Sequence, residues 1–139
     1  MSEKISFISP KNVYNIIKQT ENKLIIVYLG VYWIQQLNLS MEAILSIKDD
    51  DVLTCIINEE EYLSYCTQEK ILFGTGVLQL FYNSSALYFQ IKDKTTTKWY
   101  SPLTKQIMKL IKQKAFEAIK SQNSTLQMDD LIEESKQEK

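Results

Sequence analysis

Hydrophobic residues along the chain form short continuous runs that alternate with stretches at helical spacing. Residues 24–29 form an unbroken apolar run, which predicts a strand buried on both faces. Residues 52–57 predict a second apolar strand, and the alternating residues 4–9 predict one that precedes both. Residues 77–82 and 86–91 predict a hairpin, because the turn-forming residues Asn83, Ser84 and Ser85 lie between them.

Helices are predicted between these strands. Ser9 as N-cap and Pro10 in the first turn open a helix that runs to about residue 21. A second helix ends near residue 47, and a short third one begins at the acidic residues 59–61. Ser101 and Pro102 repeat the first start signal and open a last helix that runs to residue 120. The inward stripe of this last helix is predicted to contain Leu103, Ile107, Leu110, Ile111, Ala115 and Ile119.

Alternation of strands and helices predicts an α/β fold with a central mixed β-sheet flanked by helices. The strand–helix–strand repeats indicate a parallel part, and the final hairpin adds an antiparallel edge. Residues 49–51 are three aspartates, which predict a solvated turn, and residues 92–98 predict a polar loop. We expect one domain at residues 1–120 and an acidic, polar tail at 121–139, with a short helix at 128–134.

Composition narrows the classes of partner. The 139 residues carry a net charge of −1, contain no histidine, and have only lysine among their sixteen basic residues. Catalysis by a histidine base and bidentate binding of phosphate or guanine by arginine are therefore excluded. We expect no nucleic-acid partner. The longest apolar run is too short to cross a bilayer and no targeting segment is evident. We therefore expect a cytoplasmic protein without membrane insertion.

The two cysteines, Cys55 and Cys66, fall in different predicted elements. In this pattern cysteines are usually buried as small hydrophobic residues, whereas a metal or redox site requires closer spacing and more ligands. Cys66 has no histidine to serve as its base, and the glycines at 74 and 76 lead into a strand rather than a helix. We expect no catalytic residue, no metal ligand and no cofactor.

The order of elements resembles the thioredoxin-like fold over residues 4–120. Residues 24–34 are similar to the family's central strand and the aromatic lead-in to its active-site helix. Residues 77–84 are similar to its next strand and turn. The resemblance places the family's Cys-x-x-Cys motif near residues 33–37, which here are Trp, Ile, Gln, Gln and Leu. It places the family's cis-proline at Gly76. Without a thiolate, thiol–disulfide exchange of the family type is excluded here.

Two surfaces remain candidates for binding a protein partner. The resemblance places Tyr32, Trp33, Ile34 and Gln35 beside Thr75 and Gly76, an aromatic and mostly uncharged patch. The aromatic residues form either an interaction hot spot or a cap on the core. The second surface is the last helix, with Lys105, Lys109 and Lys112. These lysines form either a docking face for an acidic partner, such as a microtubule or an acidic tail, or an ordinary solvated face.

These observations predict a non-catalytic, thioredoxin-like interaction subunit of a larger protein assembly. Thioredoxin-like light chains of ciliary dynein arms are one precedent for such a role, and phosducin-like proteins without the cysteines are another. We expect the first role, with a location in the cytoplasm or the axoneme of a cilium. The alternatives are a divergent thiol-dependent redox enzyme that uses Cys55 or Cys66, a transferase-type relative, and a small-molecule binding module.

Overall fold

The apolar runs of the sequence form neighbouring strands of one sheet. These are β2 (Leu24–Gly30), β3 (Val52–Asn58) and β4 (Val77–Tyr82). β2 lies in the middle, parallel to β3 and antiparallel to β4. β1 (Glu3–Ser6) pairs in parallel with β3, and β5 (Ser85–Ala86) pairs antiparallel with β4. The resulting order, β1-β3-β2-β4-β5, confirms the predicted mixed sheet.

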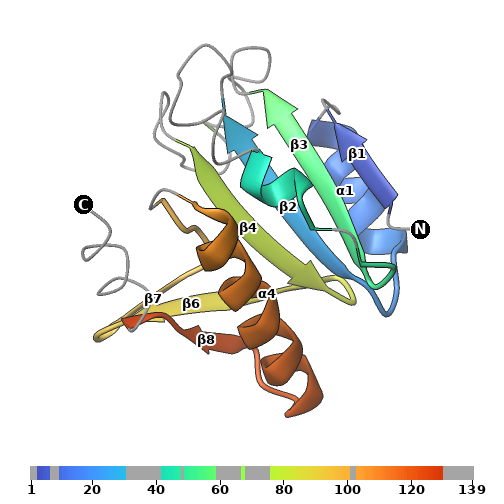
Figure 1. Cartoon of the computed structure of the whole chain (residues 1–139). Coiled ribbons are helices and arrows are strands. Elements are labelled where there is room, and N and C mark those ends of the chain that lie inside the picture. Colours follow the sequence, from blue (N-terminus) through green and yellow to red (C-terminus); the bar gives the residue numbers. More distant parts are fainter. Residues whose placement is uncertain are drawn as a thin grey trace.

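Figure 1 shows this sheet in the computed structural model, which describes residues 3–6, 10–30, 42–47, 49–58, 67, 76–100 and 103–129. The short helix predicted after residues 59–61 lies outside the described residues. Helix α1 (Pro10–Gln19) lies behind the sheet, and helix α4 (Lys105–Lys120) lies in front of it together with helical residues 42–45. The sheet is therefore covered on both faces.

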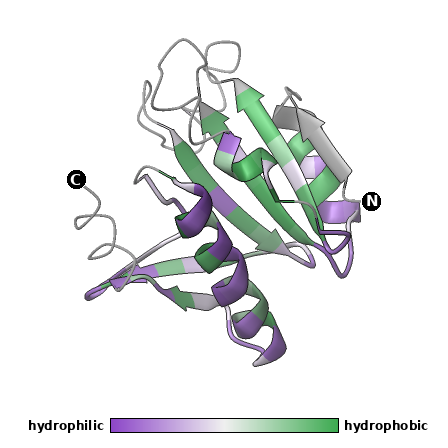
Figure 2. Ribbon diagram, viewed as in Figure 1, coloured by the Kyte–Doolittle hydropathy of each residue, from purple (hydrophilic) through white to green (hydrophobic). Residues whose placement is uncertain are grey.

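Strand alternation divides the core into two apolar clusters, because successive side chains of a strand point to opposite faces. On the α1 side, Val13 and Ile17 pack with Ile25, Val27 and Leu29 of β2. The opposite face packs against α4 and residues 43–47 and forms the larger cluster. Side chains 24–29 are at most 2% exposed, which confirms the prediction of a strand buried on both faces. Figure 2 shows the hydrophobic central strands and the hydrophilic outer side of α4.

α1 begins at Pro10, as predicted, and ends at Gln19, slightly before the predicted residue 21. Asn22 then adopts a positive φ of 61°, a conformation that asparagine tolerates better than most residues. Its backbone N–H donates to Oδ1 of Asn83 at 2.7 Å, which ties this turn to the turn after β4. Asn83 and Ser84 also have positive φ values, so the hairpin turn predicted at this position is confirmed.

The last helix begins later than predicted. α4 starts at Lys105, and Thr104 is its N-cap: the Thr104 hydroxyl accepts a hydrogen bond from the N–H of Ile107 at 3.1 Å. The prediction of an N-cap at Ser101 was therefore wrong. A side-chain oxygen can satisfy free N–H groups only within the first turn, and Thr104 is the residue directly before that turn.

A second, three-stranded sheet departs from the prediction. The expected strand at residues 86–91 is divided between β5 and β6 (Tyr88–Ile91), and only β6 belongs to the new sheet. The expected polar loop at 92–98 contains β7 (Lys94–Thr96), antiparallel to β6. Lys92 turns the chain with a φ of 55°. The loop prediction was wrong because a short edge strand can be polar on its exposed face, and threonine favours strands.

Packing also continues past residue 120. β8 (Thr125–Gln127) pairs in parallel with β6, and Leu126 and Met128 are buried in the larger cluster. Residues 121–128, which the sequence predicts as part of the tail, therefore contain the last strand of the second sheet and two residues of its core. The helix predicted at 128–134 lies almost entirely outside the described residues.

Candidate functional site

The end of β2 is where the resemblance places active-site chemistry. Leu29 of β2 lies opposite Val77 of β4, so the chain leaves β2 and enters β4 at neighbouring positions on one edge of the sheet. Gly76, directly before β4, is buried. The other residues of the predicted aromatic patch lie outside the described residues: Tyr32, Trp33, Ile34, Gln35 and Thr75. The pairing of β2 with β4 brings the chain segments that would carry the patch to the same end of the sheet. The residues that form the patch stay a prediction.

Cys55 is a free cysteine in the centre of β3, among the apolar residues that face α1, and it is fully buried. Burial raises the pKa of its thiol from the ordinary value of 9.0 to about 12, because a thiolate would lose its hydration there. At neutral pH the thiol is protonated and inaccessible to a substrate. The interpretation of Cys55 as a buried small residue is confirmed, and Cys66 lies outside the described residues.

Helix α4 presents a basic outer face. Its sequence contains five lysines and one glutamate, and no acidic residue in the first turn. The predicted inward stripe is largely confirmed: Leu103, Ile107, Ile111 and Ala115 are buried, whereas Leu110 and Ile119 are partly buried. Met108 and Ala118 are also buried, although the predicted stripe does not contain them. The inward face of α4 is therefore rotated slightly about the helix axis from the predicted one.

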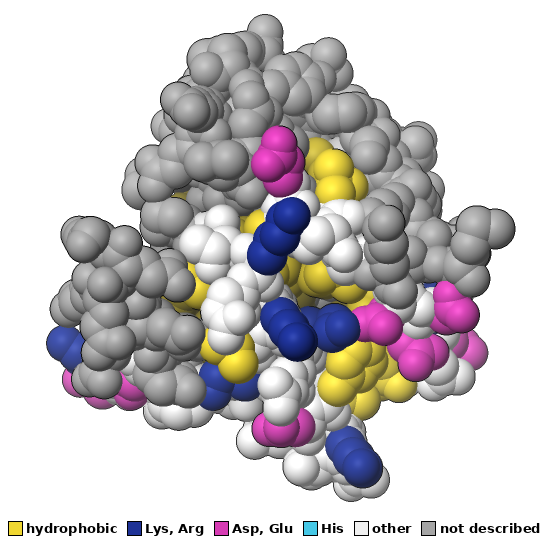
Figure 3. All heavy atoms as spheres, in the orientation of Figure 1, with side chains coloured by type: hydrophobic (Ala, Val, Ile, Leu, Met, Phe, Trp, Pro, Cys, Tyr) yellow, Lys and Arg dark blue, Asp and Glu magenta, His cyan; other side chains and the backbone are white. Residues whose placement is uncertain are grey.

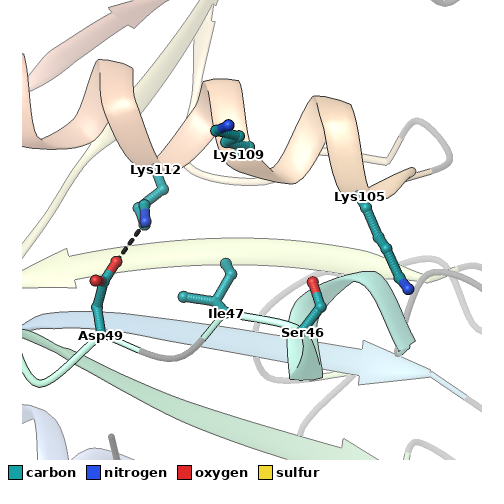
Figure 4. A pocket seen from close by; sticks show the side chains of 6 residues that line it. All are labelled: Ser46, Ile47, Asp49, Lys105, Lys109 and Lys112. Atoms are coloured by element: carbon teal, nitrogen blue, oxygen red, sulfur yellow. Dashed lines mark hydrogen bonds and ion pairs between the residues drawn. The ribbon is translucent and has the colours of Figure 1, made fainter.

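The three lysines predicted as a docking face line one cavity. Lys105, Lys109 and Lys112 border a hollow of about 310 Å³ between α4 and the chain at Ser46, Ile47 and Asp49. Figure 4 shows Lys112 reaching from α4 to Asp49, and Lys105 extending from the same helix past Ser46. The structure therefore brings these three lysines together. It adds the acidic neighbour Asp49, from the turn at residues 49–51 that the sequence predicts to be solvated.

Asp49 forms an ion pair with Lys112 through its Oδ2 atom. The side chains of Lys112 and Asp49 are 27% and 42% exposed, so water and salt screen the attraction. Among the described residues, no ion pair is formed by Lys105 or Lys109. Within the described part of the chain, two ammonium groups at the cavity therefore have no acidic partner, and a third is partly neutralised.

A second hollow continues the first along the helix. It measures about 440 Å³, and its lining is Lys109, Lys112, Gln113, Phe116, Glu117 and Lys120. The two hollows share Lys109 and Lys112 in their linings, and we call them together the α4 groove. Figure 3 shows lysine side chains gathered along this face of the molecule, with hydrophobic surface and a few acidic groups beside them.

Two other kinds of site find no support in the described part of the chain. There, no group of three or more cysteine, aspartate and glutamate side chains could hold a metal ion. Within the same residues, no helix is both long enough and apolar enough to span a membrane.

Comparison with solved structures returns thioredoxins. No protein-family model and no curated protein sequence matches the chain. A mutant thioredoxin from Halobacterium salinarum NRC-1 aligns with a TM-score of 0.60 and 12% identity, over 81% of this chain and 93% of that chain. Plasmodium falciparum thioredoxin aligns with a TM-score of 0.56 and 16% identity, over 78% and 97%. The chain has a thioredoxin-like fold.

Chloroplastic thioredoxin z gives a similar result, with a TM-score of 0.56, 17% identity, and coverage of 81% of this chain and 96% of that chain. Identities this low establish the thioredoxin-like fold alone. The predicted resemblance is therefore confirmed for the architecture, which places the end of β2 and the start of β4 side by side.

Proposed function

We propose that this thioredoxin-like chain is a non-catalytic interaction subunit of a larger protein assembly. One observation carries the proposal. Residues 31–41, which connect β2 to helical residues 42–45, contain no cysteine, and this is where the resemblance places the Cys-x-x-Cys motif. Exchange of thiols and disulfides requires a thiolate attacking sulfur, and the side chains of this segment cannot supply one.

The state of Cys55 supports the same proposal. A buried thiol with a pKa of about 12 is neither ionised nor accessible at neutral pH. The apolar packing of Cys55 in β3 gives the residue a structural explanation that needs no chemistry.

A redox enzyme is the second candidate, because the structural neighbours are thioredoxins. Since Cys55 is buried, such an enzyme would have to use Cys66. Rapid alkylation of Cys66 at neutral pH, with a lowered apparent pKa, would favour this candidate. Slow labelling that requires denaturant would count against it.

The light-chain role in ciliary dynein arms is the most specific form of the proposal. It is supported only by the resemblance of this chain to thioredoxin-like domains. The same resemblance supports the other precedent, a phosducin-like protein without the cysteines, equally well. Which assembly contains the chain is decided by the identity of its partners.

Affinity isolation of the chain at native expression level, followed by mass spectrometry, tests the proposal. We expect partners in stoichiometric amounts, and loss of them in Trp33→Ala, which removes the centre of the predicted aromatic patch. Tyr88→Ala is the matched control, because Tyr88 is an exposed aromatic residue on β6. Recovery of a folded, solitary chain would overturn the proposal.

A further inference from the structure

The geometry points to the α4 groove as a binding site for an extended peptide that carries carboxylate side chains at alternate positions around one apolar residue. The inference deepens the proposed interaction role by naming the class of partner for this surface, and it rests on that role. The first observation is the charge of the helix. α4 contains five lysines and one glutamate, whereas the whole chain has a net charge of −1. Helix α4 therefore carries an excess of positive charge that the chain as a whole lacks.

The spacing of the groove residues fits an extended peptide. Lys105, Lys109, Lys112, Phe116 and Lys120 lie three or four residues apart, on one side of the helix. A helix rises about 1.5 Å per residue, so Lys105 and Lys109 are separated by about 6 Å along its axis. In an extended strand, alternate side chains on one face are about 6.6 Å apart. Two carboxylates separated by one residue can therefore face these two lysines.

The length of the groove limits the ligand to about seven residues. From Lys105 to Lys120 the helix axis extends about 22 Å, the length of about seven extended residues at about 3.3 Å each. Four alternate side chains of such a peptide would face Lys105, Lys109, Phe116 and Lys120 in turn. Phe116 is partly buried and lines the wider hollow, where it offers an apolar contact between two basic ends.

Acidic groups in the groove favour a peptide over nucleic acid. Asp49 and Glu117 both line it, and they would repel the dense, regular phosphates of a nucleic-acid strand. A peptide can place neutral residues opposite them. The basic groups are all lysine, which binds a carboxylate as a point charge and lacks the planar fork of arginine.

The ion pair between Asp49 and Lys112 makes the site testable in both directions. Asp49 is ion-paired with Lys112, so its carboxylate competes with a ligand carboxylate for the Lys112 ammonium group. Asp49→Asn would free Lys112 and strengthen peptide binding. Removal of Lys105 and Lys109 would weaken it, and each change acts through charge on the groove side of the molecule.

The test is an NMR titration of the ¹⁵N-labelled chain with an unlabelled heptapeptide in low salt. The peptide has glutamate at its first, third and seventh positions, leucine at its fifth and threonine elsewhere. We expect amide shifts confined to α4 and the residues around Asp49, and weaker binding at 300 mM than at 50 mM salt. A peptide with glutamine in place of every glutamate should bind at least about tenfold more weakly.

Variants of the chain complete the test. Lys105→Gln with Lys109→Gln should weaken binding about three- to tenfold, and Asp49→Asn should strengthen it about two- to fivefold. The matched control is Lys18→Gln with Lys94→Gln, which removes the same charge from exposed positions on α1 and β7. Thermal unfolding verifies that each variant is folded.

Three results would overturn the inference: no shifts in the groove, equal binding of the glutamine peptide, or tighter binding of a seven-nucleotide single-stranded DNA. These results are separable from failure of the proposed interaction role. If partners are isolated with the Lys105→Gln, Lys109→Gln chain but are lost with Trp33→Ala, the interaction role stands and the α4 groove is not the binding site.

Discussion

Cys55 illustrates how the position of a single residue in a strand decides its chemistry. Adjacent side chains of β3 point to opposite faces, and both faces are covered, so the thiol has no route to solvent. Desolvation then keeps the thiol protonated and raises its pKa to about 12. The residue type that would most readily suggest redox chemistry is here part of the packing.

The raised pKa of Cys55 predicts a loss of stability at alkaline pH. Below pH 9 the thiol is protonated in both the folded and the unfolded chain. Between pH 9 and 12 the unfolded chain loses the proton and the folded chain keeps it, so unfolding becomes more favourable as pH rises. Between pH 8 and pH 10 the free energy of unfolding should fall by about 1.4 kcal/mol more in the wild type than in Cys55→Ala.

Urea unfolding under reducing conditions measures this difference. The lysines and tyrosines that ionise in the same range are common to both chains, so their effects cancel. An equal fall in the two chains would show that Cys55 can ionise in the folded state.

At the level of secondary structure, the start of α4 was mispredicted because two capping signals lie three residues apart. Ser101 is followed by proline, the stronger signal in sequence, whereas Thr104 makes the capping hydrogen bond. β7 and β8 were missed because three-residue strands with exposed polar side chains give no continuous apolar run. Their pairing with β6 depends on contacts between distant parts of the chain.

The observed N-cap predicts a difference between two conservative substitutions. Thr104→Ala should lower the free energy of unfolding by about 1 kcal/mol, since the N–H of Ile107 loses its acceptor. Ser101→Ala, at the start that the sequence predicts, should change it by less than about 0.5 kcal/mol. Chemical denaturation of both variants measures the effect, and the reverse ranking would move the N-cap back to Ser101.

β8 predicts that the stable domain extends beyond residue 120. Leu126→Ala should cost about 2–5 kcal/mol, because Leu126 is 2% exposed and packs in the larger cluster. Ser124→Ala, at an exposed position just before β8, should stay within about 0.5 kcal/mol of the wild type. If both substitutions were equally mild in thermal or urea unfolding, β8 would not belong to the folded body.

For the whole molecule, the sequence predicts the architecture better than it predicts the site. Continuous apolar runs place β2, β3 and β4 within about one residue, because burial on both faces leaves little freedom in composition. The spacing of Lys105, Lys109 and Lys112 predicts one basic face. Asp49 could not be assigned to that face from sequence, since it is 63 residues from Lys112 and meets it only through packing.

The non-catalytic role is tested most directly by thioredoxin-type disulfide reduction. The assay follows the reduction of insulin by dithiothreitol with and without the chain, and an authentic thioredoxin is the positive control. Because residues 31–41 contain no cysteine and Cys55 is buried, the rate with this chain should equal that of dithiothreitol alone. An acceleration that rises with the concentration of the chain and disappears in Cys66→Ala would contradict the proposed role and establish a redox enzyme.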